Sequence, residues 1–139
     1  MKIILEEKNR YILRFDKKEE VISELLKFCA LKKINAGFFS GLGAIQETDL
    51  AWYDVDEKTY KEKTFNEKME ILNFIGNIAV MKGKTVIHCH GTFGSKDMET
   101  FGGHVKKIVV AATCEILLES FDGKIEREYS NEIGLNLLK

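Results

Sequence analysis

The sequence lacks proline altogether, and tryptophan and cysteine are scarce. It contains one tryptophan and three cysteines, Cys29, Cys89 and Cys114, and no apolar run long enough to cross a membrane. Cys29 and Cys114 sit in apolar runs, so we interpret them as small core residues rather than parts of a disulfide framework. Because no signal peptide is recognisable either, the sequence favours a reduced, cytoplasmic setting and no membrane partner.

An excess of charge of one sign is also missing. The 21 Lys and Arg residues are balanced by 22 Asp and Glu residues, which gives a formal net charge of −1. Nucleic-acid-binding domains usually carry a basic surface, and composition shows none, although folding could still gather a local basic patch. With 45% hydrophobic and 31% charged residues, the chain has the composition of one globular domain over residues 1–139.

The hydrophobic patterns predict an α+β fold with a mainly antiparallel sheet of about seven strands. Asp16 and Glu19 resemble a helix capping box, and the apolar residues from 21 to 29 recur at helical spacing, so one principal helix should pack on the sheet. Residues 105–118 are nearly all apolar and predict a central strand covered on both faces. Ser40–Ala44 predicts a tight turn rather than a phosphate-binding loop.

All three histidines of the chain lie within 17 residues, at His88, His90 and His104. The segment around the first two has strand character, so His88 and His90 should point to one side of the strand and Cys89 to the other. Gly102 and Gly103 allow a tight backbone approach before His104, and we expect them to form a turn that lines the site. We therefore predict that the three imidazoles converge on one divalent metal ion.

Three neutral imidazoles with an open fourth position suit zinc best, while iron, manganese, cobalt and nickel also fit. The open position would take water or an anion, and a zinc-bound water can ionise near neutral pH. The structural alternative is a pair of strand histidines satisfied by hydrogen bonds. A cupin-like metalloenzyme is disfavoured, because Glu99 lies too far beyond His90 to match the cupin spacing.

Two carboxylates accompany the histidines. Glu115 interrupts an apolar run, where a charge is costly unless it is paired, and Glu70 directly precedes another. Either carboxylate could orient a histidine as an acceptor behind the metal, or act as a general base. The alternative for each is an ion pair with Arg10 or Arg14 across the sheet.

Five short segments together form a specific combination. They are Ser40-Gly41-Leu42-Gly43-Ala44, Glu70-Ile71-Leu72-Asn73-Phe74-Ile75-Gly76-Asn77, His88-Cys89-His90, Gly102-Gly103-His104 and Thr113-Cys114-Glu115-Ile116. In this order they resemble the PPC domain, the plants and prokaryotes conserved domain, over nearly the whole chain.

The resemblance implies an α+β fold, usually a homotrimer, in which the matching histidines are associated with a bound metal. In land plants the domain is joined to AT-hook motifs in DNA-binding nuclear regulators, whereas prokaryotic members stand alone and are often described as DNA-binding. An AT hook needs a Gly-Arg-Pro core, and this chain has no proline. What remains corresponds to the part of the plant proteins that mediates self-association and partner contacts.

Two functions follow. The first is a homotrimeric PPC protein with a divalent metal at His88, His90 and His104 and a small molecule or anion at the metal; the residues leave its reaction, if any, open. The second is a DNA-binding or transcription-associated regulator, as the family is commonly described, and the near-neutral charge counts against it.

Overall fold

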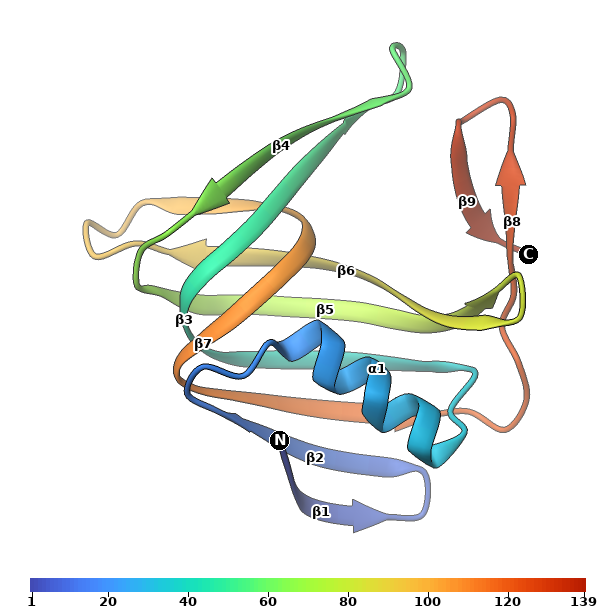
Figure 1. Cartoon of the computed structure of the whole chain (residues 1–139), viewed down its shortest axis with the longest axis horizontal. Coiled ribbons are helices and arrows are strands. Elements are labelled where there is room, and N and C mark those ends of the chain that lie inside the picture. The colour runs from blue at the N-terminus through green and yellow to red at the C-terminus, as the bar shows by residue number, and fades with distance from the viewer.

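A seven-stranded antiparallel sheet with one helix dominates the computed structural model, which describes residues 1–139 (Figure 1). The predicted α+β fold is confirmed. The elements, in chain order, are β1 (Lys2–Glu7), β2 (Arg10–Asp16), α1 (Val21–Lys32), β3 (Gly37–Asp54), β4 (Thr59–Phe65), β5 (Met69–Met81), β6 (Lys84–Gly94), β7 (Thr100–Ser120), β8 (Arg127–Ser130) and β9 (Leu135–Leu138).

Strand β7 closes the sheet on itself. The strand order is β1-β2-β7-β6-β5-β3-β4, and β7 also pairs with β3. Along one edge, β7 pairs first with β6 and then with β2, while β3 follows its other edge. The closed ring β7–β6–β5–β3 gives the sheet an inner and an outer side. Strands β8 and β9 form a separate hairpin, visible beside the ends of β5 and β6 in Figure 1.

Helix α1 begins later than the capping-box pattern predicts. Glu20 is its N-cap and accepts hydrogen bonds from the N–H groups of Ile22 and Ser23. The expected contact also exists, since the Glu19 carboxylate accepts from the Asp16 N–H at 2.8 Å, but it stabilises the turn before the helix. At 12 residues, α1 falls short of what a membrane-crossing helix needs in length and hydrophobicity.

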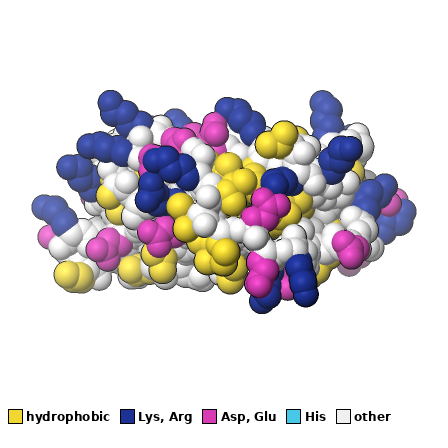
Figure 2. Space-filling model, turned by 90° about the horizontal axis from the view of Figure 1, so that it is seen from below, with side chains coloured by type: hydrophobic (Ala, Val, Ile, Leu, Met, Phe, Trp, Pro, Cys, Tyr) yellow, Lys and Arg dark blue, Asp and Glu magenta, His cyan; other side chains and the backbone are white.

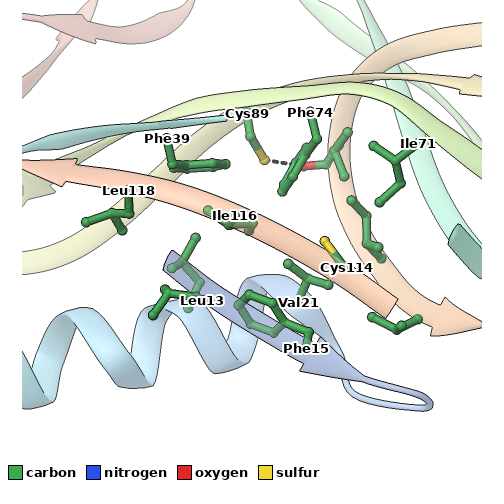
Figure 3. Packing of buried hydrophobic residues seen from close by; sticks show 14 of the residues in the cluster. Leu13, Phe15, Val21, Phe39, Ile71, Phe74, Cys89, Cys114, Ile116 and Leu118 are labelled. Atoms are coloured by element: carbon green, nitrogen blue, oxygen red, sulfur yellow. Dashed lines mark hydrogen bonds between the residues drawn. The ribbon is translucent and has the colours of Figure 1, made fainter. Parts of the chain in front are cut away.

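The core lies between α1 and the inner side of the sheet. It is a cluster of 23 buried residues, and its packing around Phe39, Phe74 and Cys89 is shown in Figure 3. Cys29, Cys89 and Cys114 are free and buried, and burial raises the pKa of each thiol to about 12. This confirms that Cys29 and Cys114 serve as small core residues.

The turn predicted at Ser40–Ala44 is wrong, because β3 continues through these residues. The glycines serve the pairing of β3 with β7 instead. A Cβ atom on Gly43, whose φ is +153°, would collide with the carbonyl oxygen of Thr113. Glycine therefore permits a close approach of two strands at a register shift.

The apolar sequence of β7 predicted a strand covered on both faces, but the structure covers only one face. Ile116 and Leu118 are fully buried, but Glu115 before them and Leu117 between them are exposed on the outer side. The strand alternates like any half-buried strand, and alternation was masked because apolar residues such as Leu117 also occupy outer positions.

Candidate metal centre

The register between β6 and β7 brings the three histidines together. His90 lies directly opposite His104, and His88 lies two positions before His90 on the same side of β6. The ring centroids of His88 and His104 are 5.0 Å apart, those of His88 and His90 5.2 Å, and those of His90 and His104 5.5 Å. One potential ligand nitrogen from each ring lies within 4.8 Å of the others.

The cluster lies on the outer side of the sheet. Cys89, between the two histidines of β6, points inward, and its Sγ donates a weak hydrogen bond to the carbonyl oxygen of Val105 at 3.5 Å (Figure 3). The expected alternation is thus confirmed. It excludes the Cys89 sulfur from the ligand set, so all three donors are imidazole nitrogens.

Burial and neighbouring charges keep two of the imidazoles neutral. The pKa of His104 is lowered to about 4, mainly by burial and further by His88, His90, Lys106 and Arg127. The pKa of His88 is lowered by burial and by the positive charge of Arg127. An imidazole must be unprotonated to bind a metal ion, so these two side chains are ready ligands at neutral pH.

A cleft of about 400 Å³ opens beside the histidines. His88 and His104 line it together with Tyr60 of β4 and Arg127 of β8. The Tyr60 ring lies 5.7 Å from the His104 ring, measured between centroids. A small molecule in this cleft would contact the histidines directly.

Gly102 and Gly103 do not form the predicted turn. Both lie within β7, and the chain reverses earlier, between β6 and β7. The predicted close approach is present, because a Cβ atom would lie 2.9 Å from the Gly91 oxygen at Gly102 and 2.8 Å from the Ala51 oxygen at Gly103. The two glycines allow neighbouring strands to approach β7 closely just before His104.

The structure does not bring Glu70 or Glu115 to the cluster. Glu70 is exposed and pairs with Gly94, five residues along β5 from the partner of His90, or roughly 16 Å away in an extended strand. Glu115 is exposed on the outer side of β7, opposite Arg14. Arg14 pairs with Asp16 instead, so the alternative ion pair with Glu115 is not formed either.

Sequence reasoning missed Tyr60 and Arg127. Tyr60 comes from an exposed, mostly charged strand, and Arg127 from a polar segment with no periodic pattern. No local motif marks either residue, because each reaches the cleft only through the packing of β4 and of the β8–β9 hairpin.

Comparisons with known proteins agree with this geometry. The sequence model of the Plants and Prokaryotes Conserved (PCC) domain, the family that the motifs resemble, matches residues 4–122. A comparison with curated proteins gives no match.

Solved structures share the whole fold. A putative DNA-binding protein from Bacteroides thetaiotaomicron is 33% identical, with a TM-score of 0.93 over 97% of this chain and 94% of that one. A metal-containing protein from Archaeoglobus fulgidus is 28% identical, with a TM-score of 0.88 over 100% of this chain and 99% of that one. A plant- and prokaryote-conserved protein from Pyrococcus horikoshii is 27% identical, with a TM-score of 0.86 over 94% and 90% of the two chains.

Proposed function

Because the chain belongs to the Plants and Prokaryotes Conserved domain family, we propose that it is a homotrimeric protein that binds one zinc ion per chain through His88, His90 and His104. The convergence of three imidazole nitrogens within 4.8 Å carries this proposal. A similar protein from Archaeoglobus fulgidus is described as metal-containing, which supports it.

The donor set favours zinc. Three nitrogen ligands without a thiolate or a carboxylate suit a tetrahedral ion that keeps one position free. When bound, zinc would act there as a Lewis acid on water or on a small ligand. The chain itself contributes an exposed entrance beside His90 and a half-buried wall beside His88 and His104.

Metal analysis of protein purified without a histidine tag tests the site. We expect close to one zinc ion per chain after dialysis against metal-free buffer. Protein that contains no divalent metal, and takes none up from stoichiometric zinc, would contradict the proposal.

An exposed apolar surface supports self-association. Six large apolar side chains, with exposed fractions of 38–59%, lie on the outer side of the sheet; this apolar sheet face consists of Ile12, Phe38, Leu42, Leu72, Ile75 and Leu117. The register places Ile12 opposite Leu117, Leu117 opposite Ser40, and Ser40 opposite Ile75. A contiguous apolar surface of this kind is typical of a contact between subunits.

Replacing Leu117 with glutamate should dissociate the trimer. The change places a charge in the middle of the apolar sheet face, where a subunit contact would have to bury it. Light scattering should then show a mass that falls from three chains to a single chain of 15.9 kDa. Leu31→Glu on α1, where Leu31 is 78% exposed, is the matched control and should leave the trimer intact. A wild-type protein that is monomeric, or an unchanged mass in Leu117→Glu, would argue against this assembly.

DNA binding is the second candidate function. Similar proteins from Bacteroides thetaiotaomicron and Ralstonia eutropha are described as putative DNA-binding proteins, at 33% and 27% identity. The net charge of −1 disfavours it, and on the side shown in Figure 2 positive and negative side chains are interspersed around central hydrophobic ones. A salt-dependent mobility shift with duplex DNA would support this function, and the absence of any shift at low salt would exclude it.

A further inference from the structure

Arg127 is a cation without a counter-charge in the wall of the histidine cleft. Its Nη1 donates to the carbonyl oxygen of Asn136 at 2.8 Å, and its Nη2 donates to Oδ1 of Asn77 at 2.7 Å. Both acceptors are neutral, and Arg127 takes part in no ion pair with a carboxylate. Its Nε is buried and has no hydrogen-bond partner. A partly buried guanidinium that contacts only neutral groups has an uncompensated desolvation cost, which a bound anion would offset.

The guanidinium lies next to the histidines. Asn77, which accepts one of its hydrogen bonds, stands opposite His88 in the pairing of β5 with β6. Directly opposite side chains in an antiparallel pair are close neighbours. Arg127 also lines the same cleft of about 400 Å³ as His88 and His104. A ligand in this cleft can therefore reach the imidazoles and the guanidinium together.

No carboxylate of this chain compensates these positive groups. Glu126 and Glu128, the neighbours of Arg127 in sequence, pair with Lys124 and Lys139. Glu62 of β4 pairs with Lys106. A divalent ion on the three imidazoles would add two further positive charges beside Arg127. The cleft thus has strong positive character at one end, which selects for an anionic ligand.

The rest of the cleft lining is mostly apolar. It comes from β5, β6 and the β8–β9 hairpin, and consists of Met81, Val86, Ile87, Gly134, Leu135, Asn136 and Leu137. An anion that fills this cleft should carry a short apolar chain as well as its charge. A planar carboxylate also matches the two-pronged geometry of a guanidinium.

We infer that this cleft binds a short aliphatic carboxylate, with the carboxylate held between Arg127 and the metal on the three histidines. The inference deepens the proposed zinc site and rests on it. In this arrangement Arg127 is a specificity-determining residue, because its guanidinium pairs with the carboxylate, which would be unfavourable in apolar surroundings alone.

Arg127 is held in place by a docked hairpin. The segment before β8 is anchored to β5, where the Val80 N–H donates to the Ile125 carbonyl oxygen at 2.7 Å. The turn of the hairpin is anchored by Tyr53 Oη, which donates to the Ile133 carbonyl oxygen at 2.8 Å, and by Lys58 Nζ, which donates to that of Asn131 at 2.8 Å. Pre-ordering of this kind lowers the entropic cost of ligand binding. The hairpin lies beyond residues 4–122, so Arg127 is not among the residues that the family model matches.

Titration of the cobalt-substituted protein with butyrate tests the inference. Cobalt(II) replaces zinc in such sites, and its visible absorption reports ligands that enter the open position. Wild-type protein should show a saturable spectral change with butyrate and none with butyramide, which lacks the charge. Arg127→Gln should keep its cobalt and bind butyrate about 10- to 100-fold more weakly. Arg127→Lys, which retains the charge but not the fork, should lie between the two.

The matched control is Arg10→Gln, because Arg10 is exposed and pairs with Glu7 away from the cleft. It should bind butyrate like the wild type. Wild-type protein that takes up no cobalt would overturn the proposed metal site itself. Cobalt-loaded protein that binds butyrate equally well with and without Arg127 would overturn this inference alone, as would equal binding of butyramide. Circular dichroism of each variant establishes that the fold is retained.

Discussion

Replacing His104 with alanine is expected to weaken zinc binding by about 100-fold or more. Loss of a residue that merely supports a metal ligand costs 10- to 100-fold, so loss of a ligand should cost at least as much. His104 would also be the only ligand from β7, and it lies directly opposite His90. Its removal leaves two imidazoles on one strand, which is too few for a stable zinc site. Competition with a chromophoric chelator at pH 7.5 measures the affinity.

Thr92→Ala is the matched control for this experiment. Thr92 lies on the same side of β6 as His90, two positions further along, but it is not part of the histidine cluster. The zinc affinity of the Thr92→Ala protein should equal that of the wild type. Retention of wild-type affinity in His104→Ala, with the fold intact, would contradict the three-histidine site.

Replacing Phe74 with alanine should lower the free energy of unfolding by about 3–5 kcal/mol. Phe74 is fully buried in the core, and its ring lies 5.2 Å from that of Phe39, measured between centroids (Figure 3). Truncation removes this aromatic contact and leaves a cavity that a closed sheet cannot readily fill. Urea denaturation of the two proteins measures the difference.

Phe121→Ala serves as the control for this loss of an aromatic ring. Phe121 follows β7 and is 46% exposed, so its truncation should change stability by roughly 0.5 kcal/mol. If Phe74→Ala were no less stable than Phe121→Ala, the assignment of Phe74 to the centre of the core would be wrong.

Local patterns identified the histidines because strand alternation is a local property. A strand through residues 85–91 places His88 and His90 on one side whatever its partners are. The same reasoning located Cys89 on the opposite side, as the structure confirms. That His104 joins them depends on the register between β6 and β7, which pairs it with His90. For this third residue, resemblance to a family strengthened a weak local signal.

The carboxylates show where local reasoning fails. Glu115 looked like a costly buried charge because its neighbours in sequence are apolar. In the structure it points to the outer side of β7, where Leu117 is exposed as well. Apolar residues on an outer face mask the alternation in the sequence, and burial of this face in the proposed trimer would account for them.

The sequence by itself determined the class of the fold, the absence of an AT hook, and the pairing of His88 with His90 on one side of a strand. These follow from composition and from periodicities of two and 3.6 residues, which neighbours in the chain set. Only the tertiary structure decided that β3 continues through Gly41 and Gly43, that Glu70 and Glu115 lie away from the site, and that Arg127 lies beside it. Each depends on contacts between residues far apart in the chain, and no local pattern encodes them. The three histidines could therefore be identified from the sequence, whereas Arg127, the charge that we infer selects their ligand, could not.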